Sequence, residues 1–186
     1  MKKIILALLT ISSAAFAEVS YSMPAVEAGF KWNSMDSAVA GSSSKQSLGI
    51  ELGGSMVFNF APQFGLRTGL FYSERPFLFD NSGIETKGKL TYAEVPLHFM
   101  FKFEDYAGIY VGPSFSMKLG EECTSGGVSC GSIDAKSMIM PITFGAEFKF
   151  TPNLGLNLFF ETVPSDLATG LKNSRAIGVN GIFVFE

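Results

Sequence analysis

The sequence predicts an all-β protein, an eight-stranded antiparallel up-and-down transmembrane β-barrel, and three observations lead to this fold. Apolar side chains recur with period two along most of the 186 residues, which is the repeat of strands whose two faces meet different environments. The connections between these strands alternate between long and short, as they do in membrane-spanning barrels. A composition of 47% apolar residues, with 19 Phe and 20 Gly, requires much apolar surface to be buried in a core or in lipid.

Eight segments carry the period-two pattern. In the segment 47–60, Leu48, Ile50 and Leu52 share one face, and the alternate positions are small or polar. Several segments reach the ~9–11 residues that cross a bilayer at a tilt. The predicted strands are residues 26–32, 47–60, 64–72, 90–103, 108–119, 137–150, 154–161 and 175–185.

The first residues have the layout of a secretory signal peptide. Lys2 and Lys3 are followed by an apolar run and by Ala15-Phe16-Ala17, a small-x-small cleavage site. The apolar run is shorter than the ~20 residues of a membrane-spanning helix, which disfavours an N-terminal anchor. We therefore expect residues 1–17 to be a cleaved signal peptide and residues 18–186 to form the barrel domain.

The connections predict two rims of different character. Short turns at 61–63, 104–106 and 151–153 would lie on one rim. The other rim would carry the long connections 33–45, 74–89, 120–136 and 163–174, which we expect to face the outside and to be available to an extracellular protein or another surface ligand. Within 74–89, the stretch Arg75-Pro76-Phe77-Leu78-Phe79 is the candidate contact patch.

Two kinds of barrel share this strand pattern. A soluble carrier of the lipocalin kind turns its apolar face inward around a small cavity, whereas a membrane barrel turns it outward. The apolar face carries Phe, Leu, Ile and Met at nearly every step, which is too much volume for the interior of an eight-stranded barrel. We therefore predict a polar network in the lumen, formed by Glu51, Arg67, Glu94, His98, Lys102, Lys118, Glu147, Lys149 and Glu161. Folding two strands about residues 104–106 places Glu94 diagonal to Lys118, which predicts an ion pair between them.

Phenylalanines gather at strand ends beside the short turns. The stretches FNFAPQFGL (58–66) and FKFTPNLGL (148–156) repeat one template of two Phe, a Pro turn and a small inward Gly. Each such hairpin meets the same bilayer interface, which favours the same residue types. The repeat therefore indicates the solvent around the strands and their topology rather than a ligand-binding site. The predicted periplasmic aromatic girdle is Phe58, Phe60, Phe64, Phe101, Phe103, Phe148, Phe150, Phe183 and Phe185.

The two cysteines, Cys123 and Cys130, lie close together in one long connection. In an exported protein such a pair is expected to form a local disulfide, with two free thiols as the alternative. A metal site would require more ligands, and no His lies nearby. We expect the disulfide to stiffen the tip of its loop.

Three phrases carry a resemblance to a known family: GLRTGLFYSE (65–74), YAEVPLHFMFKF (92–103) and IYVGPSFSMKL (109–119). With them the mature chain resembles the small outer-membrane β-barrels of Gram-negative bacteria, the OmpX/OmpA-like and porin-family (PorT-like) barrel domains. The resemblance implies export through the inner membrane, insertion into the outer membrane by the assembly machinery, contact with lipopolysaccharide, and tolerance of Pro residues inside strands. It also implies a final aromatic residue, whereas here Glu186 follows Phe185.

The function expected from these features is a structural or surface-interaction role of the adhesion type, with a plugged polar lumen. A narrow porin-like channel and a soluble periplasmic lipocalin-like carrier are the alternatives. The lone His98 is the one candidate for catalysis, and a packed lumen histidine is the favoured interpretation, so we expect no enzyme, cofactor or metal. A net charge of -3 and the absence of a Lys/Arg run argue against nucleic acid, and we expect a monomer.

Overall fold

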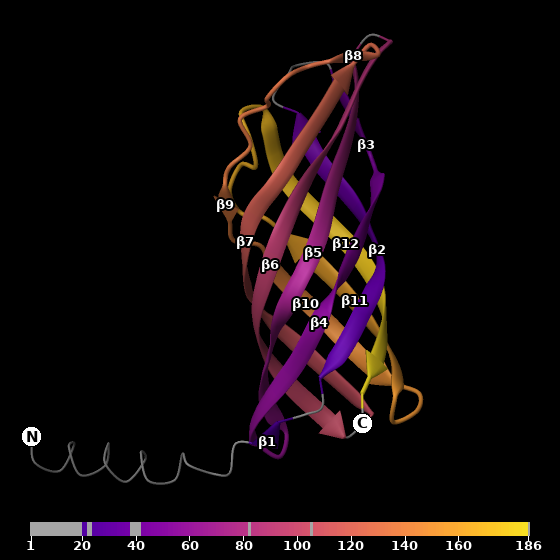
Figure 1. The fold of residues 1–186 in the computed structure, drawn as a ribbon, viewed down its shortest axis with the longest axis vertical. Helices are drawn as coiled ribbons and strands as arrows, with labels where there is room; N and C mark the ends of the chain where they lie inside the picture. The colour runs from indigo at the N-terminus through magenta and orange to yellow at the C-terminus, as the bar shows by residue number, and fades with distance from the viewer. Residues whose placement is uncertain (1–19, 22–23, 38–41, 82, 105, 186) are drawn as a thin grey trace, which may run out of the picture.

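The computed structural model describes residues 20–21, 24–37, 42–81, 83–104 and 106–185. For residues 20, 21 and 104 it describes the backbone alone. The predicted signal peptide and Glu186 lie outside the described residues. Figure 1 shows a twisted cylinder of long tilted strands. The described residues include no helix long and apolar enough to cross a membrane.

Eight long strands form a closed antiparallel ring, which confirms the predicted fold class. Each of these strands pairs with its neighbours along the ring, and the last pairs with the first, so the eight-stranded ring itself has no open edge. In ring order they are β2 (Ala25–Ser37), β4 (Ser47–Ala61), β5 (Phe64–Asn81), β6 (Ile84–Glu104), β7 (Ala107–Ser125), β10 (Ile142–Lys149), β11 (Leu154–Thr162) and β12 (Leu171–Val184). Short strands extend the wall at its ends: β1 (Ser20–Tyr21), β3 (Ser43–Lys45), β8 (Val128–Ser129) and β9 (Met138–Ile139).

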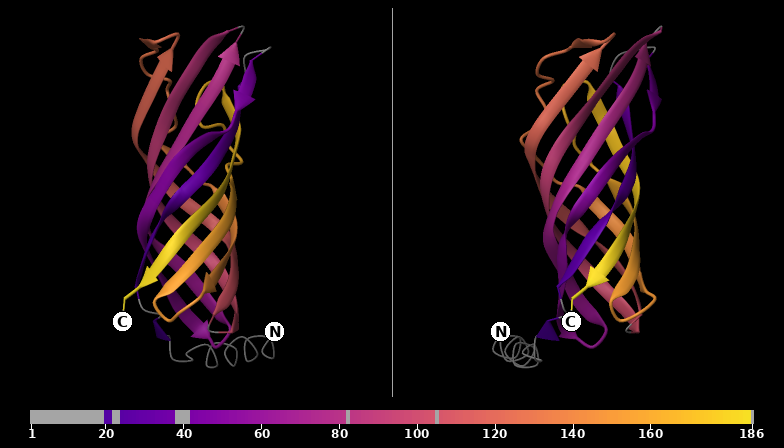
Figure 2. Two further views of the ribbon diagram at one scale, coloured as in Figure 1. Left: turned by 90° about the vertical axis from the view of Figure 1, so that its right-hand side faces the viewer. Right: turned by 45° about the vertical axis from the view of Figure 1, so that its right-hand side comes forward.

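The two ends of the barrel differ. One end, here called the turn end, carries the β4–β5, β6–β7 and β10–β11 turns and the end of β12. At the other end, here called the hairpin end, β5, β6 and β7 reach beyond the rest of the wall (Figure 2). These strands have 18, 21 and 19 residues, whereas β10 and β11 have 8 and 9.

The long hairpin strands correct several predicted connections. The segment 74–89 is not a loop, because β5 continues to Asn81 and β6 begins at Ile84. Likewise β2 continues into 33–45, β7 into 120–136, and β12 begins within 163–174. The predicted contact patch is also wrong: Arg75, Phe77 and Phe79 point into the barrel and are 0%, 4% and 7% exposed.

The polarity of the two faces inverts along the strands. Near the middle of β5 the outward side chains are apolar, with Leu70 62% exposed, and the inward ones are polar, such as Ser73. Toward the hairpin end the inward side chains become apolar, as with Phe77, and the outward ones become polar, as with Asp80. On β6, outward Lys89 likewise lies beside inward Leu90. This inversion marks where an apolar surrounding outside the barrel gives way to water.

Inward glycines are paired with inward aromatic rings across neighbouring strands. An added Cβ on Gly178 would lie 2.1 Å from the ring of Phe159, its partner on β11. An added Cβ on Gly145 would lie 2.3 Å from the ring of Tyr110 on β7. The same relationship joins Gly53 to Phe71 and Gly88 to Phe77. The glycines therefore make room for the rings that fill the barrel.

Prolines interrupt the wall at one level. Pro96 on β6 is paired with Ser114 on β7, and the Ser114 amide donates to the carbonyl of Pro141 at 2.8 Å. Because Pro141 has no N–H, the predicted strand 137–150 is divided into β9 and β10. The three residues are buried on the inner face.

Candidate functional site: the barrel interior

The centre of the barrel holds a buried layer of charges, here called the central layer. Lys31 Nζ lies 3.5 Å from Glu51 Oε2, 3.8 Å from Glu94 Oε1 and 3.6 Å from Glu161 Oε1. Arg75 donates from Nη1 to Glu161 at 2.5 Å and from Nη2 to Glu94 at 2.7 Å. The side chains of Lys31 and Arg75 are fully buried. Such a layer is stable only while every charge keeps its partner.

A second buried layer lies next to it on the side of the turn end. Arg67 donates to Glu27, and its Nε lies 3.5 Å from Glu147 Oε2. Asn157 donates from Nδ2 to Glu27 Oε2 at 3.0 Å, and its own Oδ1 accepts from the Tyr110 hydroxyl at 2.8 Å. The guanidinium of Arg67 also lies over the Tyr110 ring, with 4.8 Å to the centroid.

His98 packs beside the second layer, against Tyr110 and Ser114. Its ring stacks on Tyr110 with centroids 4.9 Å apart, and Nε2 lies 3.1 Å from Ser114 Oγ. A nucleophilic Ser–His pair also needs a group that orients the other ring nitrogen, and Nδ1 has no hydrogen-bond partner among the described residues. The nearby cavity, lined by both side chains, is only about 30 Å³, so a substrate has no room there.

The inversion of polarity produces an apolar core at the hairpin end, here called the apolar plug. It is formed by Met35, Phe77, Phe79, Leu90, Tyr92, Cys123, Ala135, Ile139, Val163, Leu167, Ala168 and Leu171. Backbone hydrogen bonds hold two connections in it, since the Lys136 amide donates to the Leu167 carbonyl at 2.7 Å. The Tyr92 hydroxyl donates to the Lys136 carbonyl at 3.1 Å. These connections therefore fold into the mouth of the barrel.

A disulfide and one carboxylate fasten the connection after β7. Cys123 and Cys130 are bonded, with Cα atoms 5.3 Å apart. Glu121 accepts from the Ser132 hydroxyl, from Lys118 Nζ at 2.9 Å and from the Ala135 amide at 3.2 Å. Glu121 lies beyond the outward apolar side chains of β7, which end at Leu119. The Ser132 hydrogen bond, followed by Lys118, lowers the pKa of Glu121 from 4.5 to about 2.

The predicted lumen residues fall in different parts of the structure. Glu51, Glu94 and Glu161 lie in the central layer, Arg67 and Glu147 lie in the second layer, and His98 lies against Tyr110 and Ser114. Lys102 and Lys149 line a cavity at the turn end. The nine predicted girdle residues lie on the outer face toward the turn end, where ring pairs such as Phe64–Phe101 have centroids 5.2 Å apart.

The predicted ion pair between Glu94 and Lys118 is wrong. The register does place Glu94 opposite Ser116. It also places Lys118 opposite Tyr92 and therefore diagonal to Glu94, but the Lys118 side chain extends toward the hairpin end and binds Glu121. Glu94 is bound by Arg75 and Lys31 instead.

Three charged residues of the layers are absent from the predicted network. Glu27 and Lys31 occupy polar positions in the predicted strand 26–32, so the period-two pattern alone could have included them. Arg75 could not be found this way, because it lies in the segment 74–89, where the period-two pattern of the wall ends. No group of His, Cys, Asp and Glu within the described part of the chain could hold a metal ion.

Comparison with solved structures identifies similar folds. Neisserial surface protein A is similar over 89% of this chain and 99% of its own, with 17% identity and a TM-score of 0.57. Ail, the attachment invasion locus protein of Yersinia pestis, is similar over 87% and 99%, with 15% identity and a TM-score of 0.47. OprG of Pseudomonas aeruginosa is similar over 90% and 99%, with 9% identity and a TM-score of 0.42. At such identities the likeness concerns the fold alone.

Comparison with curated protein sequences found no match. The family model described as "Outer membrane protein beta-barrel domain" matches residues 4–183, nearly the whole chain. The closed antiparallel ring, its apolar outer band and its charged interior agree with this match. The chain therefore belongs to the outer-membrane β-barrel protein family.

Proposed function

We propose that this protein is a closed outer-membrane barrel that acts as a structural, surface-interacting element rather than as a channel or an enzyme. The observation that carries the proposal is the filled interior. The central layer leaves a cavity of about 30 Å³, and the apolar plug covers it toward the hairpin end. A solute would have to separate the ion pairs of Arg75 and also displace the plug.

The proposed orientation places the hairpin end outside the cell and the turn end in the periplasm. Longer extracellular than periplasmic connections are the rule in such barrels. The phenylalanines of the predicted girdle would then lie at the periplasmic interface. The proposal includes a cleaved signal peptide, insertion by the outer-membrane assembly machinery, lipopolysaccharide around the outer half, and a monomeric state.

The surface most suited to a partner is the tip of the extended wall. Ile84 and Val128, at the β5–β6 and β7–β8 turns, are 58% and 71% exposed. The two turns are joined because the Gly126 amide donates to the Glu85 carbonyl at 3.0 Å. Exposed apolar side chains on a joined, protruding tip favour contact with an extracellular macromolecule.

Planar-bilayer recordings of the refolded protein test the closed lumen. The native chain should give no steady single-channel steps, because both layers of charge and the plug remain in place. A variant with Arg75, Glu94 and Glu161 all replaced by Ala serves as the control for a weakened central layer. Steady unit conductance from the native chain would contradict the proposal and support a narrow pore.

Display on the surface of a Gram-negative host tests the interaction tip. Outer-membrane fractionation and heat-modifiable gel migration should first show that the barrel is folded. Cells with the native chain should adhere to extracellular-matrix proteins more than cells with Ile84→Asp and Val128→Asp together. Equal adhesion by equally displayed chains would remove the tip from the proposed function.

A further inference from the structure

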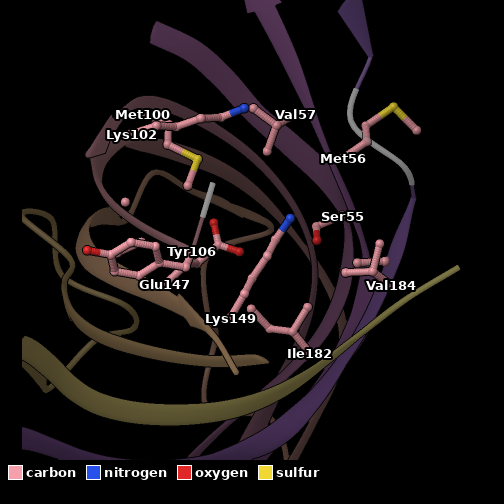
Figure 3. A pocket seen from close by; sticks show the side chains of 13 residues that line it. Ser55, Met56, Val57, Met100, Lys102, Tyr106, Glu147, Lys149, Ile182 and Val184 are labelled. Atoms are coloured by element: carbon pink, nitrogen blue, oxygen red, sulfur yellow. The ribbon is translucent and has the colours of Figure 1, made fainter. Parts of the chain in front are cut away.

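The turn end of the barrel contains a cavity that the two charged layers and the apolar plug do not use. Its volume is about 280 Å³, roughly ten times that of the central one. Figure 3 shows it opening among inward side chains of β4, β6, β10 and β12. The second layer limits its depth, because Glu147 lines the cavity and also faces Arg67.

Apolar side chains line two opposite sides of this cavity. Ala25, Ile182 and Val184 lie on the side of β2 and β12, and Met100 lies across from them on β6; they are 8%, 4%, 8% and 6% exposed. Ala25, Ile182 and Val184 pack together as one cluster. These side chains could cover the hydrocarbon part of a ligand and remove it from water.

The cavity also contains a cation without a partner in the described part of the chain. Lys149, an exposed side chain, lines the cavity, and its ammonium makes no ion pair or hydrogen bond with another described residue. Figure 3 shows this ammonium turned toward the space between Ser55 and Glu147. Lys102 adds a second positive charge and donates to Asn59 Oδ1. Glu147 forms its ion pair with Arg67, and it interacts with Lys149 and Lys102 only at longer range.

We propose that this cavity binds a small anionic amphiphile, a single carboxylate or phosphate on a short alkyl chain. Lys149 binds the anionic head, and the alkyl chain lies between Met100 and Val184. The volume restricts the ligand to a small one, since sites for drug-sized ligands occupy about 300–1,000 Å³. The site is independent of the proposed surface interaction, which uses the opposite end of the barrel.

Methionine methyl groups allow the site to be tested in lipid nanodiscs without detergent. Met100 lies in the cavity wall, whereas Met117 and Met138 are on the outer face, 58% and 66% exposed. With ¹³C-methyl methionine, added hexanoate should shift the Met100 signal along a saturable curve. Acetate at the same concentration should not do so, because it lacks the alkyl chain. A linear shift shared equally by Met100, Met117 and Met138 would show partition into lipid and overturn the proposal.

Two variants test separately the contacts of the ligand's anionic head and those of its alkyl chain. Lys149→Gln should weaken hexanoate binding roughly tenfold, as expected for loss of one charge-assisted hydrogen bond. The matched control Lys87→Gln, an exposed lysine at the other end, should leave the affinity unchanged. Ser55→Leu should narrow the cavity and so reduce the dependence of binding affinity on the length of the ligand's alkyl chain. A comparison of the affinities for hexyl phosphate and hexanoate then distinguishes a phosphate ligand from a carboxylate ligand. Unchanged hexanoate affinity in Lys149→Gln would refute the site.

Discussion

Arg75 Nη1 lies 2.5 Å from Glu161 Oε1, and this contact joins strands on opposite sides of the ring. Arg75 also binds Glu94, so one guanidinium holds two buried carboxylates. Replacing it by Met should lower the free energy of unfolding by about 3–5 kcal/mol, because both carboxylates lose a buried partner. Guanidinium unfolding followed by the fluorescence of the single Trp, Trp32, measures the loss.

The exposed pair Lys45–Asp80 provides the control for this variant. Its atoms are 3.2 Å apart, but the side chains are 52% and 35% exposed. Lys45→Met should therefore change stability by less than about 1 kcal/mol. If both replacements cost the same, the central layer does not contribute as described.

The contact between Gly178 and Phe159 predicts a steric effect. Gly178→Ala would place a Cβ 2.1 Å from the Phe159 ring, and the ring has to move within a filled lumen. We expect a loss of about 1–3 kcal/mol from this overpacking. Gly181→Ala on the same strand is the control, because its Cβ would meet only the Ala28 carbonyl at 3.8 Å. Equal unfolding midpoints for the two variants would refute the contact.

Glu121 predicts a local dependence on pH. Its pKa is about 2 in the folded protein and 4.5 without its partners, so its attachment stabilises the connection above about pH 4.5. This stabilisation should be lost as the pH falls from 4.5 toward 2. Hydrogen exchange of the Ala135 amide, which donates to Glu121, should show declining protection over that interval. Glu121→Gln should give weak protection with no such transition, and a flat profile in the native chain would contradict the prediction.

The outward face of β6 predicts a position-dependent cost of charge. Leu97 lies midway along the apolar stretch of this face, whereas Glu85 lies on the polar stretch beyond it. Leu97→Arg should destabilise the barrel in lipid vesicles by about 2–4 kcal/mol, and Glu85→Arg should have almost no effect. The measurement is unfolding from vesicles, again followed by Trp32 fluorescence. Similar values at both positions would argue against a lipid boundary between them.

The period-two pattern was sufficient to predict the membrane-spanning wall, because within lipid the solvent imposes one polarity on each face. It placed Glu51, Glu94 and Glu161 on the inner face, where the structure brings them together around Lys31. It could not specify which charges pair, since Lys118 lies diagonal to Glu94 but its long side chain extends to Glu121 instead.

The extended hairpins were missed for a physical reason. Beyond the bilayer the surrounding solvent is water, so the apolar side chains, such as Phe77 and Phe79, turn inward. A strand that crosses this boundary shows two opposite alternations, and Arg75 lies at the change between them. The segment 74–89 therefore lost the pattern of the wall without losing its strand structure. The Gly–aromatic pairs depend on neighbours across the sheet, which no single segment reveals.

The pairing of β2 with β12 has a consequence for the order of folding. These strands come from the two ends of the barrel domain, so the ring closes only after the last strand has arrived. Lys31 lies on β2, while its carboxylate partners lie on β4, β6 and β11. An incomplete sheet would leave its ammonium facing lipid or an open lumen, at a substantial cost in free energy. Closure and charge pairing are thus one event, which penalises release of a partly assembled barrel into the bilayer.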